Sequence, residues 1–212
     1  MRNYRTRLLN NEFDWIESLP WENTCEEWSE AGAEVIKQSR SRFGFVWNGE
    51  SKVFIKRYLA RRFSALWLSW LRGCKAYREA RTLRKLRKHD IPAPEPLAVV
   101  RPLIPFGRKA SYVVQEFLPG RDLLDIASSC TEEEQHTLTM AATRLGEILA
   151  AMHSIGFFHT DAHLCNFLLH EESNELYVID VDDGRFFPRL LAYHRRKNIH
   201  QIIHSGRRVT EQ

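Results

Sequence analysis

The segment FHTDAHLCNFLLHEESNELYVIDVDDG, residues 158–184, carries the strongest chemical signal in the chain. It places Asp161 two residues after a histidine and Asn166 five residues after that aspartate. The apolar runs FLLH and LYVID flank the polar EESNE and predict a short hairpin of buried strands. Because the two strands of a hairpin lie side by side, we expect Asn166 at its start to lie near Asp180 at its end.

These residue types suit metal-assisted phosphoryl transfer. In that reaction the protein positions a hydroxyl in line with the phosphate and neutralises charge on the phosphates. We expect Asp161 to accept the hydroxyl proton, and Asn166 and Asp180 to hold Mg²⁺ through their oxygen atoms. Lys56, at the end of the run VFIK, is expected to bind nucleotide phosphates, and Glu79 to pair with it. The sequence therefore predicts a complete set of residues for this chemistry.

The rest of the chain predicts an α+β protein. Residues 41–58 read as two strands joined at an Asn-Gly pair, a strong hairpin signal because both residues tolerate positive φ. Residues 75–88 predict a helix that the prolines of IPAPEP end, and 110–120 predict a further strand. Thr131 and Glu134 form a capping box for a helix that runs to about residue 153. We expect two lobes, divided near residue 119.

Several of these motifs resemble those of the protein-kinase-like fold. FHTDAHLCN resembles its catalytic loop, His-x-Asp-x-x-x-x-Asn, and VID at 178–180 resembles the segment of its metal-binding aspartate. VFIK at 53–56 is similar to the third strand with its lysine. AYREARTLRKL at 76–86 would be the C-helix and QEFLPG at 115–120 the hinge. The five motifs occur in the order of that family.

The resemblance implies a bilobal protein-kinase-like fold. An antiparallel β-sheet with the C-helix would form the N-lobe, and the C-lobe would be short and mainly helical. The chain would then consist of an N-terminal extension over residues 1–40, an N-lobe over 41–118 and a truncated C-lobe over 119–212.

The resemblance also implies roles for residues around this core set. Gly44 is a single glycine where many kinases have a glycine-rich run, so backbone amides near it would cover the phosphates. Val181-Asp182 stands in place of Phe-Gly, and Asp182 is expected as an additional metal ligand. His163 is expected to touch the γ-phosphate or the substrate, which adds it to the catalytic set. The expected nucleotide contacts are Lys56, Gly44, Glu116 and Phe117.

Within this superfamily the chain is most similar to bacterial lipopolysaccharide core kinases of the Kdo kinase and heptose kinase type. The resemblance rests on KRY after the strand, on REARTLRKLRKHDIPAPEPLA, and on HTDAHLCNFLL followed by IDVDDGR. It implies an ATP- and Mg²⁺-dependent kinase that phosphorylates a sugar of the lipid A–core. The enzyme would act as a peripheral protein at the cytoplasmic face of the bacterial inner membrane.

Composition and charge are compatible with this interpretation. The 43% of hydrophobic residues is ordinary for a globular protein, and no apolar run approaches the ~20 residues that span a bilayer. The four cysteines have no zinc spacing, so we expect reduced thiols in a cytosolic compartment. Residues 52–88 are rich in lysine and arginine, which favours a polyanionic partner such as a nucleotide or an anionic lipid surface.

Other interpretations stay open at this point. FSALWLSWLRG, residues 63–73, reads either as a buried helix or as a Trp/Arg surface that dips into an anionic leaflet. A kinase of another small acceptor fits the motifs, but such a substrate requires no membrane surface. A pseudokinase would suit the single glycine, whereas binding alone does not require Lys56, Asp161, Asn166 and Asp180 together. Nucleic-acid binding is disfavoured, because the aromatic residues are too clumped for a base-stacking platform.

Overall fold

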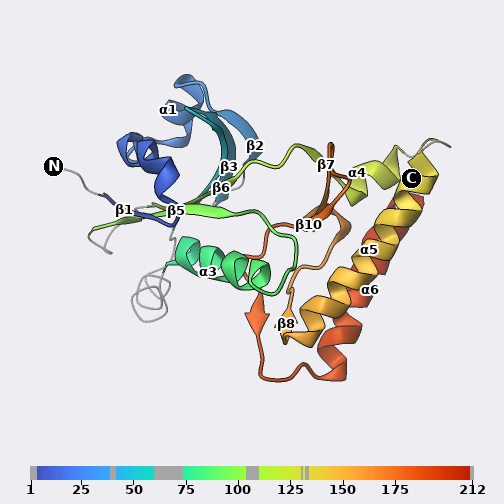
Figure 1. The fold of residues 1–212 in the computed structure, drawn as a ribbon. Coiled ribbons are helices and arrows are strands. Elements are labelled where there is room, and N and C mark those ends of the chain that lie inside the picture. The colour runs from blue at the N-terminus through green and yellow to red at the C-terminus, as the bar shows by residue number, and fades with distance from the viewer. Residues whose placement is uncertain are drawn as a thin grey trace. The chain divides into compact units, whose positions relative to one another are not determined.

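A six-stranded antiparallel sheet in the order β1-β5-β6-β4-β3-β2 organises the first half of the chain (Figure 1). β3 and β4 form the hairpin that the Asn-Gly pair predicts, although three residues, 49–51, separate the strands instead of two. A 3-10 helix η1 (Asn11–Ser18) and helix α1 (Cys25–Glu30) connect β1 to β2. The strands are β1 (Tyr4–Leu8), β2 (Glu34–Gln38), β3 (Arg42–Asn48), β4 (Lys52–Leu59), β5 (Pro96–Pro102) and β6 (Ala110–Glu116).

The computed structural model describes residues 4–38, 42–59, 74–103, 110–129, 131 and 134–210. The Trp/Arg segment 63–73 lies outside them, as do the residues between the two members of the predicted capping box. The chain divides into two compact units. Unit 1 comprises Met1–Arg84 and Glu95–Phe117, and unit 2 comprises Lys85–Pro94 and Leu118–Gln212. The predicted three-part division of the chain stays a prediction.

The two faces of the unit 1 sheet are covered differently. One face packs on a large aromatic core, in which the Trp28 ring of α1 lies 4.8 Å from that of Phe45. The other face packs on helix α3 (Lys75–Arg87), where Ala76 and Ala80 meet Val99 and other buried side chains of the sheet. Because side chains alternate along a strand, β4 sends Val53 and Ile55 to the aromatic core, and Lys56 and Tyr58 to the α3 side.

Unit 2 contains two long helices and small strands that carry the loops after them. A three-stranded sheet has the order β10-β9-β7, and β11 pairs with β8. The predicted hairpin around EESNE is confirmed as β9 and β10, which pair antiparallel. The helices are α4 (Leu123–Ser128), α5 (Glu134–Ser154), η2 (Leu164–Asn166) and α6 (Ala192–Thr210). The strands are β7 (Gly120–Asp122), β8 (Phe157–Phe158), β9 (Phe167–His170), β10 (Leu176–Val178) and β11 (Arg185–Phe186).

The chain leaves α5 through a turn that requires glycine. Gly156 has φ +75°, a left-handed conformation that residues with a Cβ rarely adopt. A Cβ at this position would also lie 2.0 Å from the backbone oxygen of Phe187. The Gly156 oxygen in turn accepts a 2.8 Å hydrogen bond from the Phe187 N–H. This turn sets the direction of β8, which leads directly into the segment with the candidate catalytic residues.

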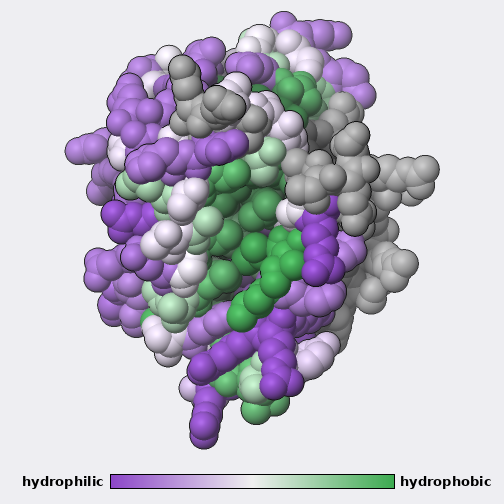
Figure 2. All heavy atoms as spheres, turned by 90° about the vertical axis from the view of Figure 1, so that its right-hand side faces the viewer, coloured by the Kyte–Doolittle hydropathy of each residue, from purple (hydrophilic) through white to green (hydrophobic). Residues whose placement is uncertain are grey.

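Figure 2 shows the side of the molecule on which α5 and α6 lie, with hydrophobic residues gathered in a band between hydrophilic ones. Exposed large hydrophobic residues on these helices include Met140 of α5 and Ile199 and Ile203 of α6. Among the described residues, no helix is both long enough and apolar enough to cross a membrane.

Candidate active site

The predicted partnership of Lys56 and Glu79 is formed within unit 1. The Lys56 Nζ lies 2.7 Å from Oε1 of Glu79, and the two side chains are 14% and 0% exposed. The Tyr58 hydroxyl donates a hydrogen bond to the other carboxylate oxygen, Oε2. A buried carboxylate requires such partners, because an unpaired charge away from water is costly. Glu79 therefore fixes α3 against β4 and holds the Lys56 ammonium in one place.

The three other predicted nucleotide contacts also lie in unit 1. Gly44 is buried in β3, directly opposite Lys56 in the strand register. Glu116 is the last residue of β6, and its Oε2 accepts a 3.1 Å hydrogen bond from the Glu95 N–H. Phe117 follows it, with the Lys52 Nζ 4.1 Å from the ring centroid. Their contact with a nucleotide stays a prediction.

In unit 2 the structure brings three predicted residues together in the loop between β8 and β9. The Asn166 Nδ2 donates to the backbone oxygen of Asp161 at 2.7 Å and lies 3.5 Å from its Oδ2. The His163 Nε2 lies 3.0 Å from the Asp161 Oδ1, so this imidazole faces the carboxylate. The Asp161 side chain is nevertheless 64% exposed. The carboxylate is thus oriented by its neighbours and still accessible to a substrate.

His159 ties this loop to the segment that carries Asp180. Its Nδ1 accepts a hydrogen bond from the Asp161 N–H, and its Nε2 donates to the backbone oxygen of Ile179. The donor–acceptor distance is 3.3 Å in both bonds. This arrangement requires the neutral tautomer with the proton on Nε2. Burial lowers the pKa of His159 below its usual value, which favours the same neutral form. The residue is 1% exposed, so its role is structural.

The β9–β10 hairpin brings Asp180 to Asn166. The Ile179 N–H donates a 2.9 Å hydrogen bond to the backbone oxygen of Asn166, which places the residue before Asp180 directly against Asn166. Asp180 itself has φ +56°, a conformation that aspartate adopts more readily than most residues. Asp182 lies two residues on and is 6% exposed. The backbone of this segment therefore turns sharply at the predicted metal ligand.

The donor atoms of this set fit Mg²⁺. Asn166 uses its amide nitrogen to bind Asp161, and its Oδ1, which lies 3.9 Å from the Cys165 Sγ, is the oxygen that would bind a cation. Together with the carboxylates of Asp180 and Asp182, it would supply the hard oxygen ligands that Mg²⁺ prefers. A cluster of three or more His, Cys, Asp or Glu residues suited to a metal does not occur in the described part of the chain. A site with one amide ligand would not be expected to form such a cluster.

Helix α6 holds the loop that carries Asp161, and this was not predicted from the sequence. The Asn198 Nδ2 donates a 2.5 Å hydrogen bond to the backbone oxygen of His159. The Gln201 Nε2 donates a 2.8 Å hydrogen bond to the backbone oxygen of Thr160. The Ser205 hydroxyl accepts from the Leu164 N–H over 3.1 Å. The three side chains follow each other at spacings of three and four, on one face of the helix. The signal in the sequence that could have predicted this contact is the row of neutral polar residues at this spacing in an otherwise basic helix.

Comparison with known proteins identifies the family. The model of the lipopolysaccharide kinase (Kdo/WaaP) family matches residues 24–212. The chain belongs to this family. The family resemblance stated from the motifs is thereby confirmed, and the protein is a kinase of the type that acts in lipopolysaccharide core synthesis. Membership in a kinase family implies the use of ATP.

Two further similarities accompany the lipopolysaccharide kinase match. A solved structure of WaaP in complex with acyl carrier protein aligns with a TM-score of 0.66 and 22% identity, covering 95% of this chain and 80% of that one. This alignment confirms the predicted α+β, protein-kinase-like fold. The mouse (Mus musculus) EKC/KEOPS complex subunit Tp53rkb is 26% identical over 180 residues, which cover 75% of this chain and 71% of the mouse protein.

Proposed function

We propose that this lipopolysaccharide kinase transfers the γ-phosphate of ATP to a sugar hydroxyl, on Kdo or heptose, of the lipopolysaccharide inner core, and that it requires Mg²⁺. The observation that carries the proposal is the network in unit 2. It orients an exposed Asp161 carboxylate beside Asn166 and joins both to the backbone before Asp180. Binding without transfer would not require this arrangement, whereas phosphoryl transfer does.

In this proposal Asp161 accepts the proton of the attacking hydroxyl. Its exposure lets a sugar hydroxyl come within hydrogen-bond reach, and its bonded neighbours hold it in one orientation. His163, on the same carboxylate, contacts the substrate or the γ-phosphate. General-base assistance of this type is typically worth about 10²–10⁴-fold in rate.

The remaining roles concern the nucleotide and the metal. Lys56, held by Glu79, binds the phosphates of ATP as a fixed positive charge. Asn166, Asp180 and Asp182 would hold Mg²⁺, which neutralises charge on the phosphates when bound. The expected nucleotide-binding residues are Lys56, Gly44, Glu116 and Phe117.

The family and the positive charge support a proposal for the acceptor and for the location of the enzyme. We propose the lipid A–core oligosaccharide as substrate and the cytoplasmic face of the bacterial inner membrane as the site of action, with peripheral contact to the anionic leaflet. The net charge of +4 supports an anionic partner.

Mass spectrometry of purified lipid A–core acceptors tests the proposal. One acceptor ends in Kdo and a second carries heptose, and each is incubated with protein, ATP and Mg²⁺. We expect a gain of one phosphate on one of them, which EDTA abolishes, excess Mg²⁺ restores and Asp180→Ala prevents. No gain on either acceptor, with ATP binding intact, would contradict the proposal and favour another small acceptor or a pseudokinase.

A further inference from the structure

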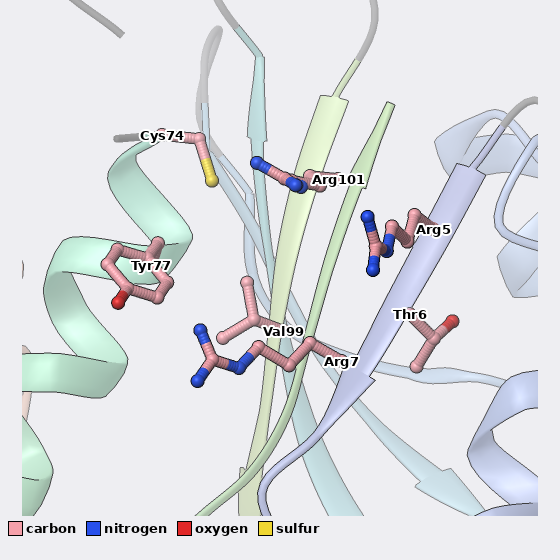
Figure 3. A pocket seen from close by; sticks show the side chains of 7 residues that line it. All are labelled: Arg5, Thr6, Arg7, Cys74, Tyr77, Val99 and Arg101. Carbon is pink, nitrogen blue, oxygen red and sulfur yellow. The ribbon is translucent and has the colours of Figure 1, made fainter. Parts of the chain in front are cut away.

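A cavity of about 440 Å³ lies between α3 and the β1–β5 edge of the unit 1 sheet. Figure 3 shows that Arg7 and Arg101 extend from the strands toward the helix, whereas the Arg5 guanidinium lies beside β1. The described residues that line it include no acid. These lining residues are Arg5, Thr6, Arg7, Cys74, Tyr77, Val99 and Arg101.

The strand register forces the three arginines together. Arg5 of β1 lies directly opposite Arg101 of β5, and Arg7 lies opposite Val99. Like charges directly opposite each other across two strands are destabilising. Charged side chains on an edge strand often prevent aggregation, which could explain the arginines of β1. Arg101 needs another explanation, because its strand β5 lies inside the sheet, between β1 and β6.

Neutralising partners for these arginines are missing from the described part of the chain. None of the described residues forms an ion pair with Arg5, Arg7 or Arg101, and only Arg7 has an aromatic contact, 5.8 Å from the Tyr77 ring centroid. The first turn of α3 lies at the same cavity, since Cys74 directly precedes the helix. The positive end of the helix dipole adds to the local potential. The three arginines are exposed, so solvent screens part of their charge, and together they give the cavity a net positive charge.

We propose that this cavity binds a phosphate ester or diphosphate group. A ligand with two or more negative charges balances several guanidinium groups at once, and phosphate oxygens match the planar fork of arginine. Tyr77 and Val99 would contact the organic part of such a ligand. The volume falls within the range of about 300–1,000 Å³ that is usual for small-molecule sites. The phosphate group belongs either to a soluble metabolite or to a lipid headgroup.

This site is distinct from the position of Lys56. Arg7, Val99, Val113 and Lys56 occupy successive strands in one row of the sheet. Three strand spacings of about 4.8 Å each separate the backbones of Arg7 and Lys56 by about 14 Å. Lys56 and the arginine cavity are thus different positions on the same face of the sheet, and the Lys56→Met variant shows whether a ligand of the cavity depends on Lys56.

Calorimetric titration with inorganic pyrophosphate tests the site on the full chain. We expect binding that Arg5→Gln and Arg101→Gln each weaken by about tenfold or more, since each removes charge-assisted hydrogen bonds. Arg78→Gln, on the exposed side of α3 outside the lining, is the matched control and should bind as the wild type does. The variants should fold, because losing one of two facing arginines relieves repulsion; the unfolding midpoint without anion verifies this.

Sedimentation with vesicles distinguishes the two sources of the phosphate. Vesicles of phosphatidylcholine with and without phosphatidic acid are compared for the same variants. Arginine-dependent binding of pyrophosphate supports a soluble ligand, and arginine-dependent binding of phosphatidic acid alone supports a lipid headgroup. The proposal is overturned if neither binds, if Arg78→Gln weakens binding equally, or if Lys56→Met abolishes binding that Arg101→Gln leaves intact.

Discussion

At the residue scale, Glu79 is a buried carboxylate whose charge is balanced by contacts from another element. Its two oxygens meet the Lys56 ammonium and the Tyr58 hydroxyl, and the side chain is fully buried. We expect Glu79→Ala to destabilise the protein by about 3–5 kcal/mol, because it removes the carboxylate partner of the mostly buried Lys56 ammonium. Tyr58→Phe, which removes one hydrogen bond, should cost about 1 kcal/mol. Urea unfolding measures both, and equal losses would contradict this ranking.

Asp161 should matter for turnover and little for stability. Its carboxylate is largely exposed, so removing it leaves no cavity in the core. We expect Asp161→Ala to lower kcat by about 10²-fold or more while the unfolding midpoint stays close to that of the wild type. Asp183→Ala, an exposed acid of the same 158–184 segment, serves as the matched control. Wild-type turnover of the Asp161 variant, measured as acceptor-dependent ADP formation, would refute the assignment.

His159 predicts a pH dependence of stability. Burial lowers its folded-state pKa below the unfolded value of 6.5, so below that pH the unfolded chain binds more protons than the folded one. The contribution of His159 to the free energy of unfolding is therefore fully present above pH 6.5 and is lost as the pH falls below 6.5. Burial is also the main cause that lowers the pKa of His153. This residue should therefore also reduce the stability of the fold as the pH falls.

Urea unfolding between about pH 7.5 and about pH 5.5 checks this, because carboxylates titrate mainly below that window. The free energy of unfolding should decrease on acidification, and the decrease should be smaller in His159→Asn. An unchanged slope in this variant would show that other groups cause the pH dependence. His153→Asn measures the separate contribution of the less buried histidine.

At the element scale, α6 acts as a support for the catalytic loop. Its three polar side chains bind backbone groups of residues on both sides of Asp161. In Gln201→Ala, loss of one hydrogen bond should lower the free energy of unfolding by about 1 kcal/mol. We expect the activation free energy for kcat to change by more than this. The reason is that small displacements of a catalytic group reduce rates strongly. Ile203→Ala, an exposed residue of the same helix, should leave kcat unchanged.

Steady-state kinetics with saturating ATP separates these effects for α6. A Gln201→Ala enzyme with normal kcat would show that the helix contributes stability alone. A parallel loss in Gln201→Ala and Ile203→Ala would instead indicate general damage to the helix.

At the scale of the whole molecule, the positive charge should govern how the enzyme meets an anionic acceptor. The net charge is +4, and charge attraction over the surface is screened by salt. Raising NaCl from about 50 mM to about 300 mM should increase KM for lipid A–core severalfold and leave kcat nearly unchanged. An acceptor sugar without phosphates is the control, and its KM should not respond. Equal salt responses of both acceptors would contradict this origin of the effect.

Local signals in the sequence were sufficient for the central elements of this fold. The Asn-Gly pair predicted the β3–β4 hairpin, and the apolar runs around EESNE predicted β9 and β10. Helix α3 ends at Arg87, one residue before the predicted end. Each of these elements has its signal within about 20 residues, because turn residues and strand alternation act locally. The short strands β8 and β11 were not predicted, since neither is long enough to show a periodic pattern.

The sequence alone determined the residue types of the candidate site and the family that carries them, since the motifs follow one another at characteristic spacings. Only the tertiary structure decided that Glu79 is fully buried, that α6 binds the catalytic loop and that Arg5 faces Arg101. The physical reason is that these contacts join residues far apart in the chain. Their burial and register arise only when strands and helices pack together, and no local pattern encodes them.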